Sequence, residues 1–349
     1  MNRWHYYLTI LLIAVTPSAL GQDEATYLDV SLAIFDMNLP QDSLVQQQED
    51  IYPAVRQAEA RYLPSFLKIM LEESGHWGAV RLLPEQDTGA ELQISGKIIT
   101  SNGRSLVIEI QAVDATGRLW IDRTFSREAV ETVSLNQVLG TDAFQYLYSD
   151  IASELAEYKA TLSAQQITEI KQVAELRYAL ALAPDVFNEF LGNDDSGHYH
   201  LLRLPADNDP FLARIREIRE HEYVFIDVVD EQYESFFVSI KPVYDLWRQY
   251  RRDQMASETD KIRRETQQGT QFRRGSYMSL RESYNNYRWS RMQDQYLDEL
   301  NEGFTNEVLP TDITLEDSLY QLSGTLEEQY QEWRDILKAL YQLDNPTGN

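Results

Sequence analysis

Apolar side chains alternate with polar ones in several short segments of the N-terminal part of the chain. The alternation is strictest over residues 91–100 and 105–114, which are separated by four residues that include Asn102 and Gly103. A period of two is typical of strands with one buried face. Asn-Gly favours a type I′ turn, in which both residues take positive φ. The sequence therefore predicts an antiparallel hairpin here.

Three further strands and one helix are predicted around this hairpin. Residues 27–37, 77–83 and 119–125 have the composition or alternation of strands. Between the first two of these segments, apolar residues recur every three or four positions from Pro53 onward, as in an amphipathic helix. Pro64 lies inside this helix and is expected to kink or split it. The predicted order is β-α-β-β-β.

Further along the chain the apolar period becomes helical. Stripes over residues 144–155 and 167–180 predict two helices. Pro210 is expected in the first turn of a third helix, where its missing N–H has no consequence. Residues 222–250 form a long aromatic stretch that we expect Pro242 to break.

Loop and turn residues complete the predicted elements. Residues 192–209 are rich in Asp, Asn, Gly and Pro, so they predict a loop. Short alternating runs within residues 307–324 predict a small hairpin. Thr325 and Glu328 predict a capping box at the start of a final helix.

Residues 1–21 have the features of a secretory signal peptide. Arg3 is basic, residues 8–15 are apolar, and Ala19 and Gly21 supply the small residues of a cleavage site. We therefore predict export to the periplasm of a Gram-negative bacterium. An uncleaved signal that anchors the protein to the inner membrane is the alternative, although the apolar stretch is far shorter than the about 20 residues of a stable span.

The composition narrows the classes of function. The chain has no cysteine, which excludes disulfides, thiol catalysis and thiolate metal sites. It holds 56 Asp or Glu against 31 Lys or Arg, a net charge of −25. An acidic surface repels the phosphates of nucleic acids. We therefore predict that nucleic acid is not a partner.

The predicted fold is α+β, with a small βαβββ domain over residues 22–130 and a mostly α-helical domain over residues 131–349. Within the second domain, residues 241–295 hold 12 Lys or Arg against 7 Asp or Glu, whereas the rest of the chain holds 19 against 49. This basic segment therefore carries +5 and the remainder −30. Aromatic residues are interleaved with the basic ones.

The basic segment has two interpretations. It forms a surface for anionic lipid headgroups, cell-wall polymer or an acidic partner, or it is the solvated edge of a helix bundle, where its arginines pair with the chain's own carboxylates. The side chains of the hypothetical surface are Arg251, Arg252, Lys261, Arg263, Arg264, Arg273, Arg274, Tyr277, Arg281, Tyr284, Arg288 and Arg291.

Motifs of catalysis and metal binding are not evident. The chain has no G-x-S-x-G, H-E-x-x-H, P-loop or G-x-G-x-x-G sequence. His198 and His200 follow Asp194 in the predicted loop, but a third zinc ligand has no recognisable spacing. We therefore predict no metal, no cofactor and no enzymatic activity. A wall hydrolase that uses one unidentified carboxylate pair is the alternative.

Residues 90–126 resemble the strand triplet of the TolB N-terminal-like and CsgG/LpoB-like domains of the bacterial cell envelope. Gly96, Asp114, Gly117 and Trp120 match the pattern of glycines, Asp-Ala-x-Gly turn and tryptophan that those domains share. The chain is also similar to proteobacterial envelope proteins, many of which are lipoproteins; this chain departs from them because it lacks cysteine. The resemblance implies an accessory or assembly function and brings no catalytic residues.

Three functions are therefore left open. The first is a periplasmic, non-catalytic binding or assembly protein with an envelope protein as partner, which an exposed sheet edge would bind by strand addition. The second is electrostatic attachment to the membrane surface or to peptidoglycan through the basic segment. The third is an enzyme of unknown class. The sequence does not define the oligomeric state.

Overall fold

The fold is described from a computed structural model of the chain. The described residues are 26–129, 142–206, 208–268, 291, 295, 296, 298, 310–315 and 318–344. The predicted signal peptide, the predicted domain boundary near residue 130 and the basic residues from Arg273 to Arg288 lie outside them.

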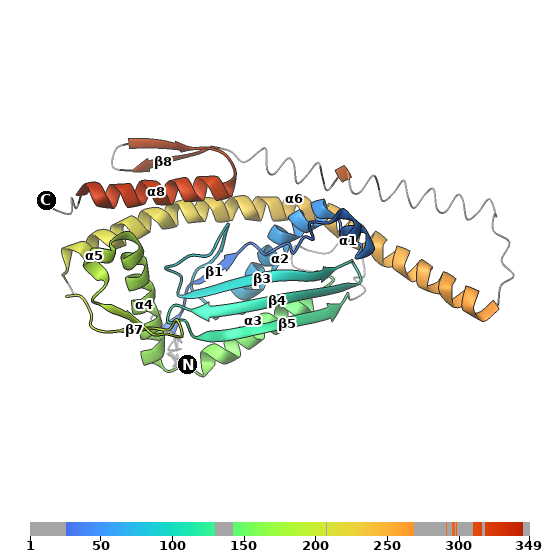
Figure 1. Cartoon of the computed structure of the whole chain (residues 1–349), viewed down its shortest axis with the longest axis horizontal. Coiled ribbons are helices and arrows are strands. Elements are labelled where there is room, and N and C mark those ends of the chain that lie inside the picture. The colour runs from blue at the N-terminus through green and yellow to red at the C-terminus, as the bar shows by residue number, and fades with distance from the viewer. Residues whose placement is uncertain are drawn as a thin grey trace, which may run out of the picture.

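A five-stranded mixed sheet forms the centre of the N-terminal part (Figure 1). Its order is β2-β1-β3-β4-β5, in which β1 is parallel to both neighbours and the other two pairs are antiparallel. The strands are β1 Val30–Ala33, β2 Val80–Leu83, β3 Leu92–Ser101, β4 Ser105–Asp114 and β5 Leu119–Glu128. The five predicted strands are confirmed, the first two with shorter bounds.

Helices cover one face of this sheet. They are α2 Pro53–Ser74, which follows the short α1 Ser43–Gln48, and α3 Gln145–Ala160. Ile94 of β3 and Ile108 of β4 lie on the covered face and are fully buried. The opposite face of β3, β4 and β5 carries mostly polar side chains and is turned toward the viewer in Figure 1.

Pro64 does not split α2, although a kink or a split was expected. A proline leaves the carbonyl oxygen four residues earlier without its helical donor, and here that oxygen belongs to Ala60. Ala60 O instead accepts a hydrogen bond from Phe35 N–H at 2.8 Å. The segment after β1 therefore supplies the missing donor. Gly75 ends the helix with a positive φ of 67°.

The β3–β4 hairpin forms as predicted, but its turn is not type I′. Only Gly103 of the two central residues takes positive φ, at 81°. The side-chain oxygen of Asn102 accepts hydrogen bonds from the N–H groups of Arg104 and Ser105 at 3.1 and 2.9 Å. Asn102 thus stabilises the turn through its side chain. Asparagine often does so in turns where its own backbone is not left-handed.

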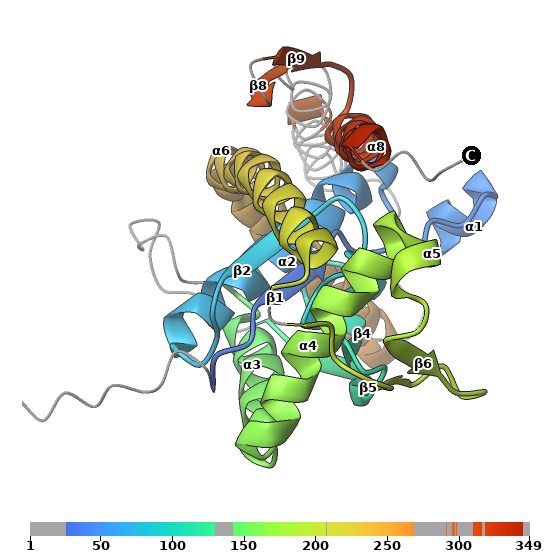
Figure 2. The ribbon, with the colours of Figure 1, turned by 90° about the vertical axis from the view of Figure 1, so that its left-hand side faces the viewer.

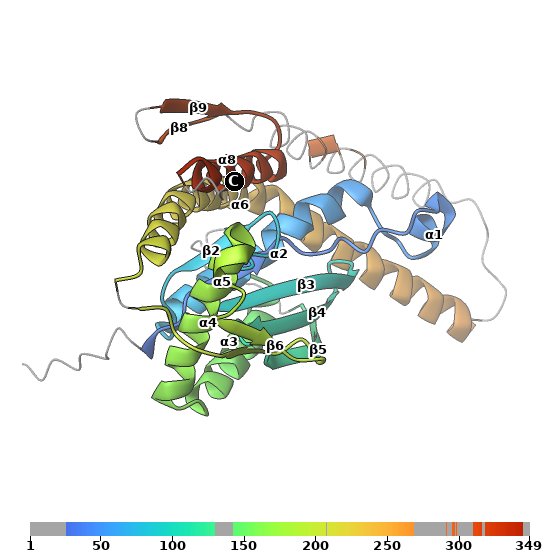
Figure 3. The ribbon, with the colours of Figure 1, turned by 60° about the vertical axis from the view of Figure 1, so that its left-hand side comes forward.

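The C-terminal part is helical, as predicted, and is dominated by α6 Pro210–Gln268, a helix of 59 residues. The other helices are α4 Ala164–Leu182, α5 Pro184–Phe187 and α8 Leu326–Asp344. α6 runs between β2 and α8 (Figure 2). α4 and α5 gather at one end of the sheet (Figure 3).

Pro242 does not break α6, contrary to the prediction. Phe237 precedes the proline and Tyr244 follows it, and both pack on Tyr62 of α2 with ring centroids 4.8 and 4.6 Å away. All three rings are buried. Packing on both sides of Pro242 offsets the about 3 kcal/mol that an interior helical proline costs.

Two short hairpins complete the fold. β8 Thr311–Leu315 and β9 Ser318–Leu322 confirm the hairpin predicted near the C-terminus, and the capping box of Thr325 and Glu328 is present. The predicted loop at 192–209 is partly wrong, because β6 Leu191–Asn193 and β7 Tyr199–Leu201 pair within and beside it. Tyr199 N–H also donates to Thr116 O at 2.9 Å, which attaches this hairpin to the β4–β5 turn.

One hydrophobic core joins the two parts of the chain. Its buried side chains come from all five strands of the large sheet and from α2, α3, α4, α6 and α8. The fold is therefore α+β, as predicted, and the two predicted domains share a core. No helix in the described part of the chain is both long and apolar enough to cross a membrane.

Candidate functional site

The first basic residues of the segment 241–295 face inward. The side chains of Lys241, Arg248 and Arg251 are 9 %, 1 % and 4 % exposed, and Arg251 forms an ion pair with Asp50. These three residues and Asp245 account for +2 of the +5 of the segment. The sequence placed Arg251 on the hypothetical basic surface, but the structure buries its side chain.

The remaining residues of the hypothetical basic surface differ in exposure and in position. Arg252 is half-buried, and Arg291 is exposed. Lys261, Arg263 and Arg264 lie in the last turns of α6, which extend beyond the end of the sheet in Figure 1. Arg273, Arg274, Tyr277, Arg281, Tyr284 and Arg288 lie outside the described residues.

Arg248 is at the centre of a buried polar network. Its Nη1 donates to Asp142 Oδ1 at 3.1 Å, and its Nη2 donates to Asp245 Oδ1 at 2.9 Å. Tyr62 O–H donates to Asp142 Oδ2 at 3.1 Å. Burial disfavours the carboxylate of Asp142, but the guanidinium of Arg248 holds its pKa below the ordinary value. The network joins α6 to α2 and to the residues before α3.

Glu59 of α2 is a second buried carboxylate beside this network. It accepts hydrogen bonds from Tyr244 O–H at 2.6 Å and from the hydroxyl of Ser101, and Arg56 Nε lies 3.3 Å from its Oε2. Burial raises the pKa of Glu59 in spite of these favourable partners. These contacts hold the end of β3, α2 and α6 together, which is a structural role.

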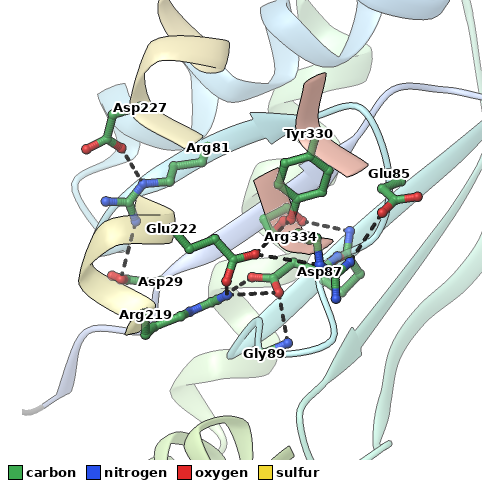
Figure 4. Close-up of polar contacts among 12 residues, drawn as sticks. Asp29, Arg81, Glu85, Asp87, Gly89, Arg219, Glu222, Asp227, Tyr330 and Arg334 are labelled. Atoms are coloured by element: carbon green, nitrogen blue, oxygen red, sulfur yellow. Dashed lines mark hydrogen bonds and ion pairs between the residues drawn. The ribbon is translucent and has the colours of Figure 1, made fainter. Parts of the chain in front are cut away.

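A third polar cluster joins the β2–β3 loop to α6 and α8 (Figure 4). Arg219 Nη1 lies 3.2 Å from Asp87 Oδ1 and 3.0 Å from Glu222 Oε2, and Gly89 N–H donates to Asp87 Oδ1 at 2.9 Å. Arg334 of α8 lies 3.8 Å from Glu222 Oε1. Charged groups of both signs are thus paired inside the fold.

A small cavity adjoins this cluster at the start of β1 and β3. Its lining includes Asp29, Arg81, Glu91 and Tyr223, and its volume is about 20 Å³. A cavity of this size holds about one water molecule, so it has no room for a substrate. No group of three His, Asp or Glu side chains in the described residues is arranged to hold a metal ion.

Glu91, on the wall of this cavity, is expected to make stability depend on pH. Its Oε2 accepts a hydrogen bond from Asp29 N–H at 2.8 Å. Burial raises the pKa of Glu91 from 4.5 to about 7. The hydrogen bond from Asp29 N–H and the charges of Lys171 of α4 and Arg219 of α6 oppose this increase, whereas the charge of Asp29 adds to it. The folded chain therefore keeps a proton on Glu91 that the unfolded chain releases. This difference contributes about 3 kcal/mol to the free energy of unfolding at low pH, and the contribution is lost as pH rises from about 4.5 to 7.

The test of this prediction is the variant Glu91→Gln. We expect its free energy of unfolding in urea to decline less than that of the parent chain between pH 5 and 8. Glu109→Gln, on the exposed face of β4, is the matched control and should follow the parent. Equal pH dependence of the Glu91→Gln variant and the parent would contradict the assignment.

The uncovered side of the sheet provides the candidate interaction site. In the described part of the chain, β2 and β5 are the edge strands. The edge of β2 is covered by α6, since Leu82 N–H donates to Asp230 Oδ1 at 2.9 Å and Arg81 Nε to Asp227 Oδ1 at 2.7 Å. β5 is ten residues long and has a neighbour only on the β4 side among the described strands.

The register shows which backbone groups β5 offers. Ala129 N–H donates to Arg104 O at 2.8 Å, which makes these two residues a hydrogen-bonded pair. Hydrogen-bonded and non-hydrogen-bonded pairs alternate along an antiparallel ladder. In the observed register the backbone groups of the odd-numbered residues from 121 to 127 therefore face β4. Those of Asp122, Thr124, Ser126 and Glu128 face outward, and all four residues are exposed.

Asp114 organises the turn from which β5 begins. Its buried carboxylate accepts hydrogen bonds from Thr116 N–H at 2.9 Å and Trp120 Nε1 at 2.8 Å. Gly117 takes a φ of 83°, and a Cβ there would lie 2.8 Å from Gly197 O of the β6–β7 hairpin. Three of the positions in the resemblance to envelope domains thus have structural roles in this turn.

A groove of about 280 Å³ lies beside this turn. It is lined by Thr116, Arg118, Glu169 of α4, and His198 and Tyr199 of the β6–β7 hairpin. His198 Nδ1 lies 3.5 Å from Asp194 Oδ2. The loop histidine that the sequence singled out thus lines a groove, whereas His200 is an exposed residue of β7.

Comparisons with protein-family models, with curated proteins and with solved structures found no match to this chain.

Proposed function

We propose that the protein is an exported, non-catalytic assembly module of the bacterial cell envelope that binds a partner protein at the β5 edge. The observation that carries the proposal is the ten-residue edge strand, whose outward backbone groups belong to the exposed residues Asp122, Thr124, Ser126 and Glu128. An exposed strand edge binds extended segments through main-chain hydrogen bonds. The resemblance of residues 90–126 to envelope domains supports the same location and role.

The asymmetry of the two sheet edges supports this choice. Soluble proteins cover or shorten exposed edges because they pair with other chains. Here the four-residue β2 is covered by α6, whereas the outer edge of the much longer β5 has no neighbouring strand or helix among the described elements. β5 is also attached to the helix behind it, because Arg123 and Arg127 of β5 form ion pairs with Glu154 and Asp150 of α3. A preformed strand loses little entropy when it gains a partner.

Photo-crosslinking in cells tests the proposal. A photoreactive amino acid at Ser126 should give a specific protein adduct in the periplasmic fraction, and one at the exposed Val238 of α6 should not. For the proline test the photoreactive residue is moved to Thr124. The variant Ser126→Pro should then abolish the adduct formed from Thr124. Proline removes an outward N–H and leaves the ladder to β4 intact.

The control for the proline variant is Ser126→Ala, which keeps the N–H group and should keep the adduct. Near-ultraviolet circular dichroism verifies that both variants are folded. The absence of any adduct from Ser126 under growth conditions that express the protein, or an adduct that survives Ser126→Pro, would refute binding through this edge.

A further inference from the structure

In the described part of the chain, only charged side chains protect the outer edge of β5. Natural proteins protect edge strands with prolines, bulges, charges or a covering element. β5 is the last strand of the sheet in Figure 1 and has no proline, and its pairing with β4 is regular from Ile121 to Glu128. The charges therefore decide which strand can pair with this edge.

The charges on the helix side of β5 are neutralised within the chain. Arg123 forms an ion pair with Glu154 of α3. Arg127 forms one with Asp150 of the same helix. Arg123 also lies over the ring of Phe125, with its Cζ 4.4 Å from the ring centroid. A partner strand therefore does not have to supply acidic residues opposite these two arginines.

The same strand of a second copy can pair with β5 in several registers. Two copies related by a two-fold axis perpendicular to the sheet bring their β5 strands together in the antiparallel direction. Each residue then faces the one that lies equally far on the other side of the axis. The outward backbone groups belong to even-numbered residues, and these face one another whichever residue lies on the axis. The side chains therefore select the register.

Opposed like charges exclude most of these registers. An axis at Asp122, Arg123, Arg127 or Glu128 places that residue opposite its own copy. An axis at Phe125 places Asp122 opposite Glu128 and Arg123 opposite Arg127. Like charges directly opposite one another destabilise a sheet.

An axis at Thr124 avoids these conflicts. Thr124 then faces Thr124 of the second copy, and Asp122 faces Ser126. Hydroxyl groups form favourable cross-strand pairs with each other and can donate to a carboxylate. Arg123 faces Phe125, whose ring an arginine can cover. Every charged residue in this register thus has an uncharged one opposite it.

Registers centred nearer the ends of β5 pair less of the strand. An axis at Ile121 pairs residues 119–123, and an axis at Ser126 pairs residues 124–128. The axis at Thr124 pairs residues 120–128. A longer paired stretch forms more main-chain hydrogen bonds, so the register centred on Thr124 is favoured.

We propose that two copies of the chain associate through β5 in the register centred on Thr124. The inference rests on the proposed function and names a second copy of the chain as the partner at the same edge. The two five-stranded sheets then form one continuous sheet, with the uncovered faces on one side and the helices on the other.

Single cysteines test this register, because the chain has no cysteine of its own. In Thr124→Cys the two Cα atoms of a hydrogen-bonded antiparallel pair lie about 5.5 Å apart, within the range of a disulfide. In Ser126→Cys the two thiols are offset by about 14 Å along the strands and cannot bridge. We expect mild oxidation of the purified mature chain to give a disulfide-linked dimer with Thr124→Cys and none with Ser126→Cys.

Sedimentation equilibrium measures the association without a disulfide. The parent chain should show a monomer–dimer equilibrium at physiological ionic strength, which screens the repulsion between two acidic copies. Ser126→Pro removes an N–H group that faces Asp122 of the second copy, and it should raise the dissociation constant at least about tenfold. Ser126→Ala keeps this group and should keep the parent value.

The outcomes separate this inference from the proposed function. A parent chain that stays monomeric at every concentration, or a Thr124→Cys variant that forms no disulfide, overturns self-association through this register. The proposed function survives either result if photoreactive Ser126 captures a different protein in cells, which the mass of the adduct identifies. A monomeric chain that also gives no adduct in cells overturns both.

Discussion

Replacement of Arg248 by Met is expected to lower the free energy of unfolding by about 3 to 5 kcal/mol, the usual effect of removing one partner of a buried ion pair. The side chains of Arg248 and Asp142 are 1 % and 0 % exposed. The variant leaves a carboxylate inside the fold without its guanidinium. Urea denaturation followed by circular dichroism measures the loss.

The pH dependence separates the effect of charge from that of volume. In the parent chain the pKa of Asp142 is lowered, so its contribution to stability is present above the ordinary carboxyl pKa and is lost as pH falls below it. In Arg248→Met the unpaired carboxylate is expected to take up a proton more readily. The stability difference between parent and variant should therefore narrow as pH falls toward 4.

Two further variants make this prediction refutable. Arg248→Met with Asp142→Leu removes both charges and should recover part of the lost stability, because no uncompensated charge is left. Arg104→Met removes an exposed arginine, 3.8 Å from Glu128, and should cost less than about 1 kcal/mol. A similar loss of stability from Arg104→Met and Arg248→Met would contradict the prediction that the buried ion pair contributes more to stability than the exposed one.

Local patterns account for most of what the sequence predicted about the fold. The strict alternation of β3 and β4 and the three- and four-residue stripes of α3 and α4 depend only on neighbouring residues. The errors came from contacts with distant residues. Pro64 is tolerated because Phe35 supplies a hydrogen bond, and Pro242 because rings on both sides of it pack on Tyr62.

The basic segment shows the same limit for the site. Arg248 and Asp142 are 106 residues apart in the chain, so no local pattern pairs them. One signal was nevertheless present: Tyr244, Arg248 and Arg251 follow Phe237 at helical spacing and share its buried face. The pairing of these arginines with the chain's own carboxylates is therefore confirmed for Arg248 and Arg251, but the helix face is buried and not solvated as that interpretation assumed.

The exposed edge and the groove could not be predicted from one sequence. The alternation of residues 119–125 predicts a strand but does not tell whether another strand lies on each side of it. That depends on the sheet order, in which β1 lies between β2 and β3 and leaves β5 last. The groove requires α4 and the β6–β7 hairpin beside the turn at Thr116 and Arg118, and the hairpin was predicted as a loop.

Replacement of Trp333 by Ala should also cost about 3 to 5 kcal/mol, the typical effect for a buried tryptophan. Trp333 of α8 is fully buried, with its ring centroid 5.9 Å from that of Phe225 and 6.3 Å from that of Tyr320. It therefore connects α6 to the β8–β9 hairpin. The change removes this connection and leaves a cavity between the three elements.

The way in which the Trp333→Ala variant unfolds tells whether α8 belongs to the same cooperative unit as the sheet. One shared core predicts a single transition, shifted equally when followed by far- and near-ultraviolet circular dichroism. Leu319→Ala, at a side chain 69 % exposed on β9, is the control and should change stability by less than about 0.5 kcal/mol. Two separate transitions would mean that α8 and its hairpin can detach while the sheet, and with it the β5 edge, stays folded.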